Sequence, residues 1–171
     1  VRPCSQPVKV RPLPEGVEVR PVQESQLRAV FDAENEAFRD HWGYIEPTEI
    51  DYQHWLAEPL NNPALWQVAW DGDEIVGMVR NFIHEEENQA FNRQRGYTEN
   101  ISVRRPWRRK GVARALLTRS IRMFQEMGME ETVLGVDTGN PNGALKLYQS
   151  VGYQEFKRYE TLRKPLTLSN R

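Results

Sequence analysis

A strand, a basic turn and a long amphipathic helix follow one another past the middle of this chain, and this order most constrains its fold. Residues 97–103 have the pattern of a strand, and residues 111–127 place apolar side chains along one helical face up to Gly128. Six of the eleven residues from Arg104 to Arg114 are basic, and none is acidic. The first turn of a helix carries unpaired N–H groups and the positive end of the helix dipole. The segment therefore predicts an anion site where the strand meets the helix.

Shorter strands and helices surround this unit. Between residues 23 and 40, apolar side chains recur at helical spacing, with Glu34 as an exception. Asp71-Gly72-Asp73 predicts a tight hairpin turn, because Gly adopts positive φ readily. In chain order, the other predicted elements are a strand at 17–22, a helix from about 48 to 59, hairpin strands at 65–70 and 74–84, a polar turn region at 85–95, a strand at 132–136, a helix from 141 or 142 to 151, and one or two strands at 153–163. This order predicts a mixed α/β domain around one sheet.

The beginning of the chain has a different character. The first sixteen residues contain four prolines, which is typical of a linker, and the only cysteine, Cys4, lies among them. We therefore predict a linker or tail over residues 1–15 and a single domain over residues 16–171. The chain also lacks an initiator Met, which together with the prolines indicates the C-terminal part of a longer polypeptide. An N-terminal tail on a complete protein is the alternative.

Composition excludes several classes of protein. A chain of 171 residues predicts one domain, and no apolar run approaches the roughly 18 residues of a membrane span. The net charge of −1 gives no general attraction to nucleic acid or to an anionic membrane. Three His and one Cys without close pairing make a structural zinc site unexpected, so we predict no metal. These bounds favour a soluble cytoplasmic domain.

Two motifs carry a resemblance to a known family. Residues 108–113 fit the pattern Gln/Arg-x-x-Gly-x-Gly/Ala, and residues 140–153 contain Asn followed by Leu-Tyr-x-x-x-Gly-Tyr. In this order they resemble the signature motifs of the GNAT superfamily of acetyl-CoA-dependent N-acyltransferases, over roughly residues 97–153. The turn ends in Ala113 rather than Gly. The Asn of the second motif lies eight residues before Tyr148, so that either Asn140 or Asn142 fits its role.

A second, shorter resemblance concerns the domain organisation. Residues 37–43 (Ala-Phe-Arg-Asp-His-Trp-Gly) and 12–16 (Pro-Leu-Pro-Glu-Gly) are similar to the C-terminal domain of tandem GNAT proteins related to mycothiol synthase. This resemblance implies that a second GNAT domain precedes residue 1 in the full-length chain. It does not establish the substrate.

The GNAT resemblance implies a fold and a set of residues that contact the cofactor. The fold would be a central mixed, mostly antiparallel sheet of six or seven strands, flanked by about four helices, with a splay between the two central strands. Acetyl-CoA, as co-substrate, would lie in the splay. The implied cofactor-binding residues are Ile101, Ser102 and Val103 through their backbone, Arg108, Arg109, Lys110, Gly111, Val112, Ala113 and Arg114 around the pyrophosphate, and Asn140 on the cofactor arm.

The same resemblance implies two catalytic residues. Glu99 is the candidate base that takes a proton from the attacking amine, directly or through water, and a solvated strand carboxylate is the alternative interpretation. Tyr148 matches the tyrosine that protonates the departing thiolate, and a core aromatic is its alternative. Glu85, Glu86 and Glu87 could instead line the acceptor site. Further candidates for the acceptor pocket are His41, Trp42, Tyr44 and Trp55.

The leading functional hypothesis is an N-acyltransferase that moves an acetyl group from acetyl-CoA to a primary amine of a small molecule or peptide. The GNAT resemblance implies that the amine attacks directly in a ternary complex. Cys4 lies far in sequence from the motifs, which argues against an acyl-cysteine intermediate. One alternative is a non-catalytic acyl-CoA-binding or regulatory half of a tandem protein. A third hypothesis, nucleic-acid binding through residues 104–110, conflicts with the nearly neutral net charge.

Overall fold

A single six-stranded sheet organises the protein in the computed structural model, which describes residues 1–41, 43–137 and 143–160. The strand order is β1-β6-β5-β4-β3-β2, and every neighbouring pair is antiparallel except β5 and β6. The strands are β1 (Arg2–Pro3), β2 (Val17–Val19), β3 (Gln67–Asp71), β4 (Glu74–Ile83), β5 (Arg95–Val103) and β6 (Glu131–Val133). The expected mixed, mostly antiparallel sheet is confirmed.

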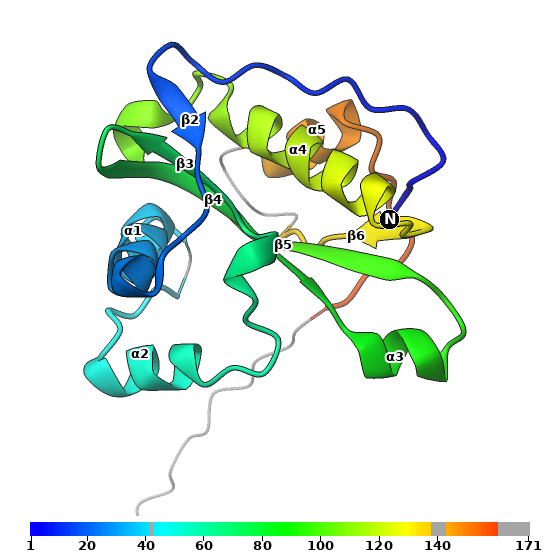
Figure 1. Ribbon diagram of the computed structural model, residues 1–171, viewed down its shortest axis with the longest axis horizontal. Coiled ribbons are helices and arrows are strands. Elements are labelled where there is room, and N and C mark those ends of the chain that lie inside the picture. The colour runs from blue at the N-terminus through cyan, green and yellow to red at the C-terminus, as the bar shows by residue number, and fades with distance from the viewer. Residues whose placement is uncertain (42, 138–142, 161–171) are drawn as a thin grey trace, which may run out of the picture.

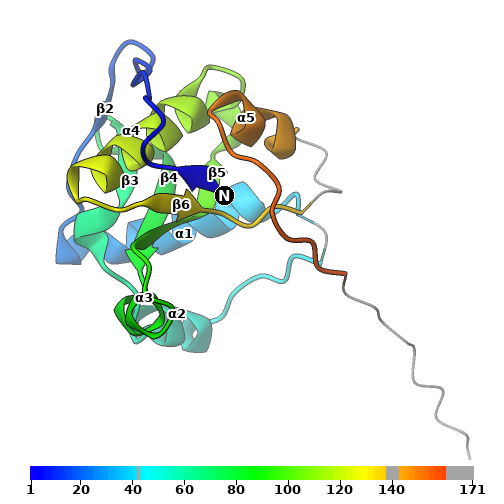
Figure 2. The same ribbon diagram turned by 90° about the vertical axis from the view of Figure 1, so that its right-hand side faces the viewer.

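Helices cover both faces of the sheet (Figures 1 and 2). They are α1 (Leu27–Phe38), α2 (Glu49–Leu56), α3 (Glu85–Ala90), α4 (Val112–Glu126) and α5 (Ala144–Ser150), with short 3-10 turns η1 (Glu24–Gln26), η2 (Pro63–Leu65) and η3 (Arg105–Trp107). In Figure 1, α1 lies on one side of the strands, while α4 and α5 lie on the other. The described residues thus form three layers, helix on sheet on helix.

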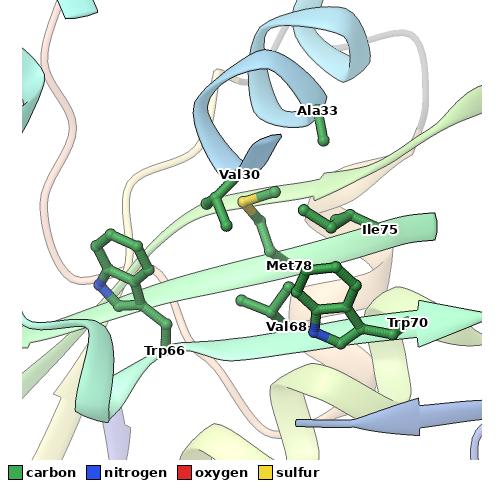
Figure 3. Close-up of a cluster of buried hydrophobic side chains, with 7 residues drawn as sticks. All are labelled: Val30, Ala33, Trp66, Val68, Trp70, Ile75 and Met78. Carbon is green, nitrogen blue, oxygen red and sulfur yellow. The ribbon is translucent and has the colours of Figure 1, made fainter. Parts of the chain in front are cut away.

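Side chains of β3 and β4 build a separate core on each face of the sheet. Figure 3 shows Val30 and Ala33 of α1 above Val68, Trp70 and Met78. The opposite face carries the neighbouring positions of the same strands, packed against α4. Its buried members are Val17, Ala69, Val76, Val79, Val112 and Leu116. Along β3 a period of two explains this division, with Val68 and Trp70 on one face and Ala69 on the other. Along β4 the spacing is three, since Ile75 and Met78 share one cluster and Val76 and Val79 the other, and the register between β3 and β4 shifts at Trp70.

β5 and β6 separate halfway along β5. The parallel pairing of β5 with β6 ends at Tyr97 opposite Val133, whereas β5 continues to Val103. On its other side, β5 contains a bulge, since the register against β4 shifts between Met78 and Arg80. Asn100 adopts φ +48° within this bulge. The second half of β5 therefore has a free side that faces away from β4, as the expected splay requires.

The first residues of the chain differ from the expected linker, because they pack against the domain. β1 pairs with β6, and the backbone N–H of Cys4 donates to the carbonyl of Glu130. The Arg2 side chain is only 2% exposed. It donates hydrogen bonds of 2.9–3.1 Å to the backbone carbonyls of Pro3, Gln6, Pro7 and Val151. Sequence pattern does not predict this arrangement, because the N-terminal residues are held by one buried guanidinium and have no apolar periodicity.

Two further predictions of secondary structure were wrong. Residues 85–90 of the polar region form α3, which Nδ1 of His84 caps by accepting a hydrogen bond from the Glu87 N–H. Three glutamates in its first turn suit the helix dipole, and the region lacks the apolar periodicity that would predict a helix. Residues 153–160 form no strand. Instead, β1 lies beside β6, and Val1 and Gln154 exchange backbone hydrogen bonds of 2.7 and 2.8 Å.

Candidate functional site

A groove of about 1040 Å³ lies between the free half of β5, the start of α4 and the N-terminal part of α5. It brings together most residues that the sequence singles out. The predicted residues that line it are Glu99, Ile101, Ser102, Val103, Arg108, Arg109, Gly111, Val112, Ala113, Arg114 and Tyr148. Lys110 is absent from the lining, and its ammonium group lies 4.7 Å from the centre of the Trp107 ring. Asn140 and Asn142 lie outside the described residues.

The turn before α4 exposes a row of backbone N–H groups. Gly111 is the N-cap, with φ +88° and no side-chain cap, and the first hydrogen bond along the helix runs from the Ala115 N–H to the Gly111 carbonyl. Arg109 also adopts positive φ, at +66°, which is uncommon for a residue with a Cβ. The N–H groups of residues 112–114 precede that first bond and therefore have no partner within the helix. A phosphate oxygen is a suitable acceptor for them.

Three of the six basic residues in the segment 104–114 form hydrogen bonds with other groups of the protein. Arg104 donates to Glu36 and Glu74, and Arg105 to Asp40. Arg108 donates to the Val103 carbonyl at 3.0 Å, to Asp40 at 2.6 Å and to the Ala37 carbonyl at 2.9 Å. Its guanidinium therefore joins the end of β5 to the end of α1. Sequence reasoning missed this structural use, because these acidic partners lie 30–68 residues earlier in the chain.

The groove offers polar backbone groups along its length. The N–H groups of residues 112–114 lie at one end, and the part of β5 beyond Tyr97, which lines the groove, pairs with no described strand on its β6 side. Ser102 belongs to this part of β5, and its Oγ is buried without a partner among the described residues. The free backbone groups suit a long ligand with polar groups along its length. The phosphopantetheine arm of acetyl-CoA has this character.

Glu99 lies where β5 and β6 separate. Its carboxylate accepts a hydrogen bond of 3.2 Å from the backbone N–H of Gly135, which follows β6. Burial raises the pKa of Glu99 above its usual range, and the hydrogen bond from Gly135 opposes this shift. A carboxylate with a raised pKa is a stronger base than an exposed one, and it therefore suits proton abstraction.

Tyr148 reaches the groove from α5. The residue is 8% exposed, and its ring packs edge-on against Tyr153 with the ring centres 6.4 Å apart. Burial and the nearby charge of Glu99 raise the pKa of Tyr148 to about 12. The phenol therefore stays protonated at neutral pH. The ring belongs to a core cluster, and the residue also lines the groove, so this position is compatible with either interpretation of Tyr148.

A second, smaller cavity of about 200 Å³ meets the groove at Glu99 and Asn100. The other residues that line it are Glu58, Leu60, Asn61, Trp66, Arg80, Asn81 and Phe82. Sequence reasoning did not select any of these. One signal was present: Glu34 interrupts the apolar face of α1, and the structure places its carboxylate 3.2 Å from Arg80.

The residues that the sequence proposed for the acceptor pocket are elsewhere. His41 lines the large groove, and Tyr44 donates to Glu46 on the surface. Trp55 lines neither cavity but packs against Arg80, whose guanidinium carbon lies 5.2 Å from the centre of the Trp55 ring. The glutamates 85–87 belong to α3 and line neither cavity. Trp42 lies outside the described residues.

Comparisons with known proteins agree with this geometry. Residues 27–153 match the model of the acetyltransferase (GNAT) family. N-alpha-acetyltransferase MAK3 of Arabidopsis thaliana is 41% identical over 96 residues, which cover 56% of this chain and 48% of that protein. Mycothiol acetyltransferase of Streptomyces scabiei is 32% identical over 129 residues, which cover 75% of this chain and 39% of that protein. This chain thus spans less than half the length of either relative.

A solved structure extends the likeness to the fold. A GCN5-related N-acetyltransferase from Sphaerobacter thermophilus superimposes with a TM-score of 0.70 and 29% identity, over 88% of this chain and 45% of that one. The splayed sheet, the open turn before α4 and the groove between them define an acyl-CoA-binding fold. The chain belongs to the GNAT family of acetyltransferases.

No group of three or more His, Cys, Asp and Glu side chains among the described residues is placed to hold a metal ion. No described helix is both long and apolar enough to cross a membrane.

Proposed function

We propose that this protein is an acetyl-CoA-dependent N-acetyltransferase that acts on a primary amine by direct attack in a ternary complex. The observation that carries the proposal is the position of Glu99. This carboxylate lies at the junction of two cavities, one lined by the motif residues and the other by a separate set of polar and aromatic residues. A base placed between two binding cavities suits a reaction in which two substrates meet.

The large groove would hold acetyl-CoA, which supplies the acetyl thioester. Its pyrophosphate would lie at the N–H groups of residues 112–114, with Arg109 and Arg114 adding positive charge. Backbone groups of Ile101, Ser102 and Val103 would pair with the pantetheine arm. Arg108 would act by positioning the turn, and Lys110 by its charge beside Trp107. Asn140 remains a prediction for the cofactor arm.

Glu99 and Tyr148 would manage the two protons of the reaction. Glu99 would accept a proton from the ammonium group of the acceptor, directly or through water, so that a neutral amine can attack. Tyr148 would donate a proton to the leaving thiolate from its Oη. The high pKa of Tyr148 keeps that proton in place until negative charge develops on the sulfur.

The proposal has two further parts. A cytoplasmic location is included because the activity depends on acetyl-CoA. A second domain of the same family in the full-length polypeptide is also included. This second domain is supported by the greater length of two related proteins: the chain covers 39% of the mycothiol acetyltransferase and 45% of the Sphaerobacter protein.

Two measurements on the purified chain test this function. Acetyl-CoA binding is measured by calorimetry, and turnover by release of free thiol in the presence of a panel of amines. Gly111→Glu is expected to abolish binding, since it places a carboxylate beside the unpaired N–H groups at the start of α4. Gly72→Glu is the matched control, because Gly72 also has positive φ with open space around it but lies in the β3–β4 turn.

Each outcome is informative. Undiminished acetyl-CoA affinity in Gly111→Glu, with Gly72→Glu behaving like the wild type, would contradict the assignment of the cofactor site. Binding without turnover of any amine would instead support the non-catalytic alternative.

A further inference from the structure

The smaller cavity offers information about the acceptor that the motifs do not give. It meets the cofactor groove only at Glu99 and Asn100, so a ligand in it would approach the candidate base from the side opposite to acetyl-CoA. This location follows from the proposed function and rests on it. The chemistry of the cavity wall then restricts the kind of amine that can enter.

The cavity has an excess of negative charge. Two carboxylates line it, those of Glu58 and Glu99, and Arg80 is the only cationic residue among the described residues that line it. The charge of Arg80 is already engaged, because its Nε lies 3.2 Å from the buried carboxylate of Glu34 and its Nη1 donates to Asn61 at 2.8 Å. Arg80 Nη1 also lies 3.9 Å from Glu58. The guanidinium of Arg80 thus lies beside the carboxylates of Glu34 and Glu58, and Glu99 adds a further acidic group to the wall. Acidic groups therefore outnumber basic ones around the cavity, which favours a cationic ligand.

The remaining wall suits a slender apolar chain. Leu60, Trp66 and Phe82 contribute apolar surface between the polar groups. The volume of about 200 Å³ is below the roughly 300–1,000 Å³ of most small-molecule sites. A chain of methylene groups fits such a space better than a sugar ring or the branched end of a peptide. Asn81 also lines the cavity, is fully buried, and has an Oδ1 without a partner among the described residues.

We propose that the acceptor is a linear aliphatic diamine or polyamine, with its reacting amine at Glu99 and its distal ammonium group at Glu58. The side chain of Glu58 is 52% exposed, which places it where a longer polyamine can continue into solvent. Glu58 is therefore a specificity-determining residue rather than a catalytic one. Glu58 favours acceptors that carry a second ammonium group. The length of the methylene chain decides whether that group reaches Glu58 while the first amine lies at Glu99.

The experiment compares matched acceptors at saturating acetyl-CoA. Diaminopropane, diaminobutane, diaminopentane and diaminohexane are each paired with the monoamine of the same chain length. A tripeptide with a free N-terminus and an aminoglycoside complete the panel. The diamine of best length is expected to exceed its monoamine in kcat/KM by about tenfold or more, as a charge-assisted contact to one carboxylate would give.

A variant assigns this preference to Glu58. Glu58→Gln should reduce the diamine-to-monoamine ratio to about one, because the distal ammonium group loses its ionic partner. Glu46→Gln is the matched control, since Glu46 is a solvent-exposed carboxylate that lines neither cavity, and it should leave the ratio unchanged.

The outcomes separate the two proposals. Equal use of monoamines, or better turnover of the tripeptide or the aminoglycoside, overturns the diamine inference and leaves the acetyltransferase function intact. A ratio that survives Glu58→Gln also overturns the assignment of Glu58. Binding of acetyl-CoA without turnover of any acceptor overturns the proposed function, and the inference with it.

Discussion

Nη1 of Arg108 lies 2.6 Å from Oδ2 of Asp40, although 68 residues separate them in the sequence. The same carboxylate accepts hydrogen bonds from Arg105, and the two arginines hold the pKa of Asp40 well below its usual range. Asp40 follows the end of α1, while Arg108 begins the turn that leads to α4. This contact therefore joins the helix on one face of the sheet to the turn that leads into α4 on the other.

Asp40→Asn is expected to weaken acetyl-CoA binding without touching the groove. The substitution removes the charge that holds Arg108, so the turn loses part of its order, and Kd should rise by about two- to fivefold, as for other exposed ion pairs. Calorimetry measures the change. Glu155→Gln is the control, because it breaks the exposed pair with Arg158 and lines neither cavity. Equal affinities for all three proteins would mean that the Asp40 contact has no role in binding.

Tyr148→Phe is expected to lower kcat with little change in the affinity for acetyl-CoA. The variant keeps the ring in its core cluster and removes only the hydroxyl group, so the loss should be about 10²-fold. Steady-state kinetics with the best acceptor measures it.

Tyr153→Phe provides the comparison for Tyr148. Its hydroxyl lies 3.2 Å from Thr132 and 3.3 Å from Thr98, in a buried network outside the groove. This variant should lower the melting temperature more than kcat. If Tyr148→Phe behaves in the same way and retains wild-type kcat, Tyr148 is a packing residue only.

The local part of the site was predictable from the sequence, and the long-range part was not. Gly111 and the helix after it form a pattern within a few residues, so the uncapped helix start, which suits an anion, could be predicted from local sequence. The roles of Arg108 and Arg80 depend on partners in α1, which no local pattern reveals. Glu34 gave the one visible signal, since a carboxylate on an apolar helix face requires a buried partner.

The same distinction applies to the fold. The turn at Gly72 and the amphipathic α4 were predicted correctly, because each follows from local residue pattern. The place of β1 beside β6 was not, since it depends on Arg2 meeting carbonyl groups from distant parts of the chain. Low apolar content near the N-terminus therefore did not identify a free tail.

Deletion of residues 1–14 is accordingly expected to destabilise the domain. The truncated chain loses β1 and leaves the Val151 carbonyl without its hydrogen bond from the buried Arg2. Arg2→Ala should produce much of this effect, at a cost of about 2 kcal/mol or more, since four carbonyl groups lose their donor. Thermal unfolding measures both. Arg11→Ala is the control, because only the backbone N–H of Arg11 makes a hydrogen bond, to Thr118. Wild-type stability of the truncated chain would restore the linker interpretation.

The buried pair of Glu34 and Arg80 predicts a pH dependence of stability. Burial raises the pKa of Glu34 to about 7, and Arg80 opposes this shift only in part. In the unfolded chain the pKa returns to its ordinary value of about 4.5. Between these two values the native state binds more protons than the unfolded state does. The contribution of Glu34 to stability therefore falls as pH rises from about 4.5 to about 7 and stays at its lower value above that.

Glu34→Gln should remove this dependence. The amide does not titrate, so it adds no pH dependence of its own. The fall in melting temperature from about pH 5 to pH 8 should therefore be smaller in Glu34→Gln than in the wild type. Its absolute stability should also fall, because Arg80 loses its buried ionic partner and keeps only the longer contact of 3.9 Å with the half-exposed Glu58. Glu24→Gln, at an exposed position of η1, is the control and should keep the wild-type pH profile. An unchanged profile in Glu34→Gln would mean that Glu34 does not titrate in this range, and that its charge is held by Arg80 throughout.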